Sequence, residues 1–269
     1  MTKTTSILFL GLVFSNFLFA QKVEITTKAI EDNRIQIIIQ NKTKLDQSVE
    51  LDCKLDGMTA SESLPKTQFV RAGAEAVFVT LSPKDIYKAH SFGTSIRYVE
   101  GNVMAAHDDD FIYRLPYPKG KTYKVDQGYL GNKTHQNQYA LDFNMNTGSE
   151  IAAIRDGVVS KVEDKNDRGC PSENCNPYNN YIIITHEDGS IADYSHLKKR
   201  GAKVKVGDQV KAGDIIGLSG ATGWASGPHL HLEVYTVSWN KHKTIEAKYY
   251  LGKGEVGIPK EGMTYKKID

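Results

Sequence analysis

The sequence predicts a mainly β protein in which an immunoglobulin-like N-terminal β-sandwich precedes a compact antiparallel β-sheet of barrel-sandwich type. Short alternating segments separated by polar turns fill residues 21–114, and a second strand-rich stretch with more glycine follows. No long amphipathic helix interrupts either stretch. We therefore expect two β domains of different character.

The N-terminus has the pattern of a secretory signal peptide. Lys3 precedes an apolar run from about residue 7 to residue 19, and the small residue Ala20 follows. Such a run is short for a membrane-spanning helix. We predict that residues 1–20 are removed. The mature protein is then exported to the periplasm, the cell envelope or the medium, and no stable membrane span is expected.

Residues 21–114 read as an accessory β-sandwich. The segments 34–39, 76–79 and 95–99 are rich in β-branched and aromatic residues, and turn signals such as Glu-Asp-Asn at 31–33 separate them. This region contains no cluster of residues with catalytic chemistry. We expect it to position the second domain, to gate its substrate or to bind a partner.

Proline and glycine mark a boundary at residues 115–121, Leu-Pro-Tyr-Pro-Lys-Gly-Lys. Strand patterns resume from residue 122 to residue 240. They include a near-repeat, Val-Gly-Asp at 206–208 and Ala-Gly-Asp at 212–214, which suits the corners of a strongly bent sheet. Residues 241–269 are expected to form an extension whose fold the sequence does not indicate.

Charge and cysteine usage exclude some functions. The formal net charge is +2 and no block of lysine and arginine occurs, so we expect no nucleic-acid partner. Cys170 and Cys175 are close enough to form a disulfide in an oxidising compartment, which leaves Cys53 as a free thiol. Their spacing excludes a structural zinc site of four cysteines.

The most informative motif is Gly-Pro-His-Leu-His-Leu-Glu-Val at residues 227–234. Positions two apart in a strand share a face, so His229 and His231 should point the same way. Together they can bind a metal, or one can bind while the other acts beside it. A catalytic zinc takes three protein ligands, and the upstream candidates are His135 and Asp142.

Six segments in this order resemble the lysostaphin-type zinc peptidases of the LytM family, over about residues 122–237. The order is more specific than any single segment. The segments are Tyr-Ala-Leu-Asp-Phe (139–143), Ala-Ile-Arg-Asp-Gly-Val-Val (153–159), Tyr-Ser-His-Leu (194–197), the Val-Gly-Asp/Ala-Gly-Asp pair, Ser-Gly-Ala-Thr-Gly (219–223) and the two-histidine motif.

The resemblance implies an exported zinc metalloendopeptidase, a peptidoglycan hydrolase that cuts cross-links or bridges by metal-activated water in a groove across its sheet. It implies that His135, Asp142 and His231 hold one zinc ion per chain. His229 would then be the general base, and His196 would orient the attacking water or stabilise the transition state. The expected partner is a peptidoglycan peptide, and the oligomeric state stays open.

One position departs from the commonest pattern of this family, which has a histidine four residues before the aspartate. That position is Gln138 here, and the nearest upstream histidine is His135, seven residues before Asp142. A related subset of the family with the same Tyr-Ala-Leu-Asp-Phe segment also has a longer loop between these ligands. His135 is therefore the expected ligand.

Three further expectations concern residues around this motif. Asp193 and Glu233 could hold an imidazole in one tautomer, depending on which way they face. His186, at a hairpin edge, is expected to face solvent. The alternative function is a non-catalytic cell-wall-binding or hydrolase-activating protein on the same fold. A carrier domain is disfavoured because the hairpin near residues 207–214 lacks a suitably placed lysine.

Overall fold

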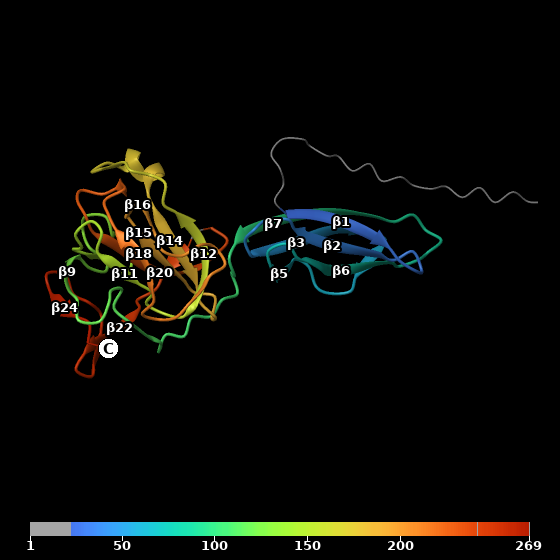
Figure 1. The fold of residues 1–269 in the computed structure, drawn as a ribbon. Coiled ribbons are helices and arrows are strands. Elements are labelled where there is room, and N and C mark those ends of the chain that lie inside the picture. The colour runs from blue at the N-terminus through green and yellow to red at the C-terminus, as the bar shows by residue number, and fades with distance from the viewer. Residues whose placement is uncertain (1–22, 241, 269) are drawn as a thin grey trace, which may run out of the picture.

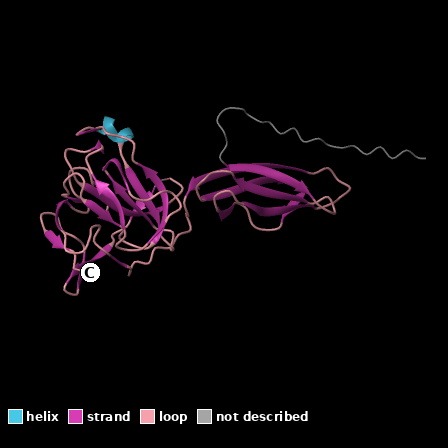
Figure 2. Cartoon of the chain, viewed as in Figure 1, coloured by secondary structure: helices cyan, strands magenta, loops and turns pink. Residues whose placement is uncertain are grey.

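The structure, a computed structural model, describes residues 23–240 and 242–268. Within them nearly all regular structure is β-strand, and the single helical element is the 3₁₀ helix η1, Glu173–Tyr178 (Figure 2). The mainly β class is therefore confirmed. The predicted signal peptide, residues 1–20, lies outside the described residues. Among the described residues, no helix is long and apolar enough to cross a membrane.

Residues 23–100 form two antiparallel sheets (Figure 1). One sheet has the order β1-β2-β6-β4 and the other β5-β3-β7. The strands are β1 (Val23–Ala29), β2 (Ile35–Asn41), β3 (Gln47–Asp56), β4 (Met58–Ala60), β5 (Lys66–Val70), β6 (Glu75–Pro83) and β7 (Ser91–Glu100).

The two sheets enclose one hydrophobic core, as a sandwich requires. Ile37 and Ile39 of β2 and Val49 and Leu51 of β3 are all fully buried in it. Each pair is spaced by two residues, and strand alternation turns both members toward the opposite sheet. The predicted sandwich is therefore present, while its immunoglobulin-like character stays a prediction.

The second region is built on a nine-stranded sheet of order β17-β12-β14-β15-β20-β10-β9-β24, with β21 also pairing with β20. Every pairing in it is antiparallel. The strands are β9 (Thr122–Gln127), β10 (Ala140–Phe143), β12 (Gly157–Glu163), β14 (Tyr181–Thr185), β15 (Ile191–Ser195), β17 (Gln209–Val210), β20 (Leu230–Val237), β21 (His242–Thr244) and β24 (Thr264–Lys266).

Three small sheets complete the second region, with the orders β11-β18-β16, β13-β19 and β23-β22-β8. The core shared with the large sheet includes Phe143, Ile184, Ile216 and Leu232, all essentially unexposed. The strands are β8 (Ile112–Tyr113), β11 (Glu150–Ala152), β13 (Gly169–Cys170), β16 (Leu197–Ala202), β18 (Ile215–Ser219), β19 (Gly223–Trp224), β22 (Lys248–Gly252) and β23 (Glu255–Gly257).

The Gly-Asp near-repeat forms two similar turns. Gly207 and Gly213 have φ of 93° and 101°, a conformation that glycine adopts without a steric penalty. In each turn the following aspartate accepts a hydrogen bond from a backbone N–H three residues earlier, Asp208 from Lys205 and Asp214 from Lys211. The repeated sequence thus closes two corners in the same way, as expected from its pattern.

The predicted linker and the C-terminal segment both pack against the second region. Leu115 and Tyr117 are fully buried in its core. The hydroxyl of Tyr117 donates to the carbonyl of Tyr265 (2.9 Å), and β24 pairs with β9 and forms the edge of the sheet. The apolar side chains of the linker explain this packing, because burial removes them from water. The domain boundaries themselves stay a prediction.

Candidate metal centre and groove

Three neighbouring strands of the large sheet place the site residues. Asp142 on β10 lies directly opposite His231 on β20, and Ser195 at the end of β15 lies opposite His231 on its other side. His229 immediately precedes β20, and His196 immediately follows β15. Antiparallel pairing therefore brings together polar side chains from segments almost ninety residues apart in the sequence.

His135 reaches the same place from the loop between β9 and β10. Its side chain is 1% exposed, and Nδ1 donates to the carbonyl of Gly128 (3.1 Å). A carbonyl oxygen only accepts hydrogen bonds, so this contact assigns a proton to Nδ1 and leaves Nε2, which faces Asp142, as the nitrogen available to a metal ion. The longer loop between His135 and Asp142 thus brings the ring to the carboxylate.

The donor atoms of His135, Asp142 and His231 form a compact triangle. Oδ1 of Asp142 lies 3.2 Å from Nε2 of His135 and 3.0 Å from Nδ1 of His231, and the two nitrogens are 3.3 Å apart. A tetrahedral ion with zinc-like bonds of about 2.0–2.1 Å would hold two donors about 3.3–3.4 Å apart. The spacing and the donor types therefore fit one small divalent ion.

Mutual hydrogen bonding dominates the electrostatics of this triangle. Burial raises the pKa of the Asp142 carboxyl, but hydrogen bonds from His135 and His231 outweigh it and hold the pKa well below its usual range. Burial lowers the pKa of the His231 imidazole, whereas its hydrogen bond to Asp142 and nearby carboxylates raise it, with a net result of about 9. The triangle therefore combines an ionised carboxylate with positive charge.

His229 and His196 lie beside the triangle, and in each ring Nδ1 is the nitrogen that donates a hydrogen bond to a backbone carbonyl. Nδ1 of His229 donates to the carbonyl of Gly227, and Nδ1 of His196 donates to that of Thr222, each at 2.8 Å. Both Nε2 atoms therefore carry lone pairs. The two ring centroids are 4.5 Å apart, and Nε2 of His229 lies 3.8 Å from Oδ1 of Asp142.

The predicted shared face of the two-histidine motif is therefore observed. His196 is also held neutral. Burial, followed by the neighbouring rings of His229 and His231, lowers its pKa to about 3.

Asp193 and Glu233 face each other across β15 and β20. Asp193 accepts a hydrogen bond from the hydroxyl of Ser195 (2.7 Å), and Glu233 lies 3.4 Å from the ring of His242. Burial and the charge of Glu233 raise the pKa of Asp193 to about 6. Their main contacts are thus Ser195 and His242. The tautomer of His135, by contrast, is fixed by the backbone carbonyl of Gly128. The pattern of side chains in the sequence does not predict this contact.

A groove of about 730 Å³ runs past these residues. Its polar lining is mostly side-chain amides, carboxylates and imidazoles, with Trp224 as the large aromatic side chain. The glycine-containing segment that follows β18 contributes Ala225, Ser226 and Gly227 to one wall. The lining includes Asp126, Lys133, Asn144, Asn146, Asn179, Trp224, Ser226 and the five site residues.

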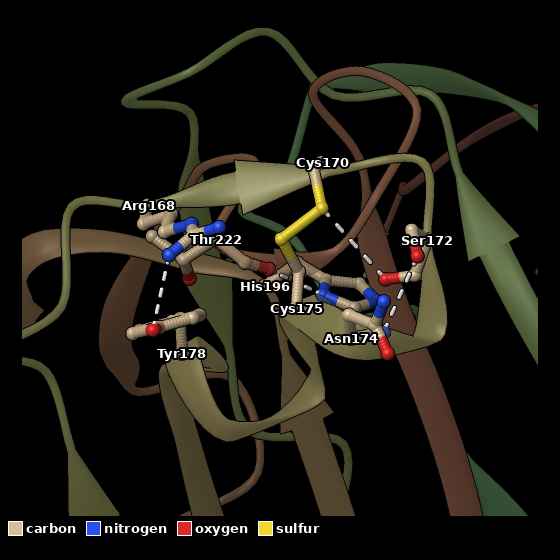
Figure 3. Close-up of a disulfide and its surroundings, with 8 residues drawn as sticks. All are labelled: Arg168, Cys170, Ser172, Asn174, Cys175, Tyr178, His196 and Thr222. Carbon is tan, nitrogen blue, oxygen red and sulfur yellow. Dashed lines mark hydrogen bonds between the residues drawn. A yellow bond between two sulfur atoms is a disulfide. The ribbon is translucent and has the colours of Figure 1, made fainter.

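Asn176 and Asn179, which line the groove, follow a short loop that is closed by a disulfide (Figure 3 shows the disulfide). Cys170 and Cys175 are bonded, as expected from their spacing, and Cys53 is free and half-buried. The loop continues through η1 to Asn179, which lines the groove. Neither Asn179 nor Thr222 stands out in the amino-acid sequence as a candidate site residue. The nearest signal was that each lies in or beside a motif already noted for other reasons.

The expectation that His186 faces solvent is wrong. The side chain is 3% exposed; Nδ1 donates to the carbonyl of Asp156 (2.8 Å), and Nε2 has no partner. Tyr113 packs nearby, with ring centroids 6.2 Å apart. Burial lowers the pKa of His186 to about 4. A residue at a hairpin edge is exposed only if no other segment packs over it. Here the segment that contains Tyr113 covers His186.

Comparison with known proteins identifies the second region. The model of peptidase family M23 matches residues 136–246, which include Asp142, His196, His229 and His231 and begin one residue after His135. Residues 136–246 therefore form a domain of peptidase family M23, and the similar proteins include lysostaphin-type peptidases.

Three similar proteins illustrate the match. Glycyl-glycine endopeptidase ALE-1 of Staphylococcus capitis is 38% identical over 116 residues, 43% of this chain and 29% of that protein. Peptidoglycan DD-endopeptidase ShyC of Vibrio cholerae is 37% identical over 107 residues, 39% of this chain and 22% of that protein.

The solved catalytic domain of lysostaphin from Staphylococcus simulans is 32% identical, with 46% of this chain and 87% of that chain covered and a TM-score of 0.34. The matches to the first curated relatives span 29–33% of those proteins' lengths.

Proposed function

We propose that this protein is an exported zinc metalloendopeptidase that hydrolyses peptide bonds in peptidoglycan cross-links or bridges. The observation that carries the proposal is the triangle of His135, Asp142 and His231 on the wall of an open groove, with His229 and His196 beside it. Relatives named as glycyl-glycine and peptidoglycan DD-endopeptidases support the substrate class.

His135, Asp142 and His231 would hold the zinc ion. Two imidazole nitrogens and one carboxylate oxygen are ligands typical of catalytic zinc, and three protein ligands leave one position open. Zinc binding would displace the proton that His231 holds in the triangle. Bound there, zinc would supply a Lewis acid that activates water and polarises the scissile carbonyl. Asp142 contributes a single negative charge, so the site keeps net positive charge with a divalent ion. The carbonyl of Gly128 keeps the ring of His135 in the tautomer that a ligand needs.

His229 and His196 would handle the proton and the attacking water. Nε2 of His229 faces the triangle with its lone pair free, so it can accept a proton from water and pass it to the leaving amine. His196 stays neutral because its pKa is lowered to about 3. A neutral ring protonated at Nδ1 can only accept at Nε2, which favours the role of orienting water over that of donating to an oxyanion.

The groove suits an extended peptide. Its amide side chains, such as those of Asn144 and Asn146, can pair with the N–H and C=O groups of a substrate backbone, which would otherwise lose hydrogen bonds on leaving water. Substrate binding in this groove would place a backbone carbonyl near the triangle. The polar lining is therefore consistent with recognition of a peptide rather than of an apolar ligand.

Digestion of purified peptidoglycan tests the proposal. Protein lacking residues 1–20 is incubated with sacculi that have meso-diaminopimelate cross-links and with sacculi that have glycine bridges, and the products are analysed by mass spectrometry. We expect new peptide termini from one of them, and their loss in His231→Ala. Zinc-loaded protein that cleaves neither preparation would contradict the proposal and favour a non-catalytic wall-binding or hydrolase-activating role.

A further inference from the structure

His196 adopts a backbone conformation that is unfavourable for a residue with a side chain. Its φ is 66°, in the left-handed region that non-glycine residues rarely occupy. It lies between the last residue of β15 and the first residue of β16, at the point where the chain leaves the large sheet. Such a conformation persists only when surrounding contacts hold it. The contacts of His196 therefore determine where its ring points.

Two hydrogen bonds from two different segments hold His196. The backbone N–H donates to Oδ1 of Asn179 (3.0 Å), and the ring Nδ1 donates to the carbonyl of Thr222 (2.8 Å; Figure 3). The first bond fixes the backbone and the second fixes the ring. With both in place, Nε2 can point only toward the groove and the neighbouring ring of His229.

The side chain of Asn179 belongs to a series of hydrogen bonds in which the donor and the acceptor of each bond can be assigned. Because a backbone N–H only donates, the amide oxygen of Asn179 must face His196, and its NH₂ group then faces Ser195. This group donates to Oγ of Ser195 (2.9 Å), whose hydroxyl in turn donates to Asp193 (2.7 Å). Each polar atom in the chain has a partner of the right kind, so the amide cannot rotate without losing two bonds.

Asn179 is itself anchored at the end of the disulfide-closed loop. Its N–H donates to the carbonyl of Asn176 (3.0 Å) and closes η1, the helix that contains Cys175. Gly223 approaches so closely that a methyl group there would lie 2.8 Å from Cβ of Asn179. The loop therefore packs directly against the segment that supplies Thr222.

The same loop also fixes the second partner of His196. β13, which contains Cys170, pairs in parallel with β19, the strand that follows Thr222. The N–H groups of Gly223 and Ala225 donate to carbonyls of Arg168 and Cys170. Both hydrogen-bond partners of His196 are thus tied to one covalently closed loop.

We propose that Asn179 is a positioning residue for His196, held in place by the loop closed by Cys170 and Cys175. The proposal rests on the catalytic function given above, because it assigns a role within the same site. Asn179 acts through the backbone of His196 and not through the substrate. Its loss would leave the His196 N–H without its partner and release the left-handed conformation, so that Nε2 no longer meets the attacking water in a fixed direction.

A double-mutant cycle separates this role from a substrate contact. Asn179→Ala, His196→Ala and the double variant are assayed on a cross-linked muropeptide dimer released from sacculi by a muramidase. We expect Asn179→Ala to lower kcat by about 10- to 100-fold with little change in KM. In the His196→Ala background the same change should have no further effect, because a positioning residue acts only through the group it positions.

The matched control is Asn174→Ala, which alters an exposed asparagine of the same helix that does not line the groove. It should leave kcat and KM within about twofold. A rise in KM for Asn179→Ala with unchanged kcat would identify a substrate contact and overturn the proposal. An equal loss of kcat in the wild-type and His196→Ala backgrounds would also overturn it.

Amide hydrogen exchange of His196, followed by NMR, tests the same bond without any assay of activity. Exchange should be faster in Asn179→Ala and unchanged in Asn174→Ala, and an unchanged rate in both would overturn the proposal. If Asn179→Ala does not fold, Asn179→Leu, which has a similar shape but no acceptor for the His196 N–H, is used in the same cycle with the same criteria. If wild-type protein cleaves no muropeptide but exchange behaves as expected, the catalytic function fails while the anchoring of His196 by Asn179 stands.

Discussion

The two regions of the molecule are both antiparallel β structures with apolar cores, but they differ in what else they bury. In the N-terminal sandwich, the buried polar side chains among the described residues are Asn41, Gln47 and Ser48. The second region buries a larger and more varied set. It includes Gln127, His135, Asn180, His186, Ser190, Ser195, Ser219, Thr222 and Glu233. Because burying polar groups is costly unless they are paired, such a concentration indicates a site.

Two asparagines make the contrast specific. The NH₂ group of Asn41 lies within hydrogen-bond distance of the carbonyls of Leu45, Val70 and Arg71, and its Oδ1 accepts from the N–H of Thr43. These contacts close one turn and tie the end of β2 to the end of β5. The side chain of Asn179 instead links the backbone of His196 to the hydroxyl of Ser195 in the groove. The same residue type therefore stabilises a fold in one region and, in the role proposed above, orients His196 in the other.

The largest expected effect is at Asp142. Asp142→Asn should reduce kcat/KM on the order of 1000-fold, because the neutral amide removes the charge that two imidazoles contact. Digestion of sacculi measures the change. The control is Asp52→Asn in the sandwich, where the carboxylate accepts from the N–H of Cys53 on an exposed face. An equal fall in kcat/KM in Asp142→Asn and Asp52→Asn would contradict the view that the second region alone contains the catalytic site.

The buried ring of His186 should make stability depend on pH. Its pKa falls from an ordinary 6.5 to about 4 on folding, so the unfolded chain binds a proton more tightly between these values. Stability should decrease as the pH falls from 6.5 toward 4, by as much as about 3 kcal/mol. Urea unfolding at several pH values measures it. A slope that is unchanged in His186→Gln would contradict this account.

Asn41→Ala should lower stability without lowering activity. Removing the side chain leaves several buried carbonyl groups without donors, at a cost of about 2–3 kcal/mol. Urea unfolding measures the loss, and kcat on muropeptides below the unfolding transition should stay within about twofold. A large fall in kcat would show that the sandwich takes part in catalysis, contrary to the contrast drawn above.

The disulfide should contribute a smaller stabilising effect, confined to the second region. Replacing both Cys170 and Cys175 by serine should cost about 2 kcal/mol, because the short closed loop gains freedom in the unfolded chain. Cys53→Ser, at a free and half-buried thiol in the sandwich, is the matched control and should cost less than about 1 kcal/mol. Equal unfolding midpoints for wild type and the double variant would contradict this expectation.

The sequence predicts the strands of both regions and the shared face of His229 and His231, since both follow from local alternation. It also predicts the disulfide, because only four residues lie between the two cysteines. These features depend on spacing along one segment. Local physics is sufficient for them, and no distant contact has to be known.

Features that depend on distant segments could not be derived in this way. The position of His135 depends on a loop and on the carbonyl of Gly128. The sequence offers His135 as a candidate ligand, and the family resemblance makes it the expected one. The burial of His186 depends on Tyr113, more than seventy residues earlier in the chain. The role inferred for Asn179 depends on where β13 pairs with β19. In each case the position of the side chain depends on a backbone group or on a segment far away in the sequence. The pattern of side chains along the chain does not predict such a contact.

Metal content measured together with mutation tests the central claim most directly. Wild-type protein purified without chelators and analysed by plasma mass spectrometry should contain about one equivalent of zinc per chain. His135→Ala, Asp142→Ala and His231→Ala should each lose most of it, while Asn41→Ala retains it. Less than about half an equivalent in wild type, or full occupancy in all three site variants, would contradict the assignment of these residues as the metal ligands.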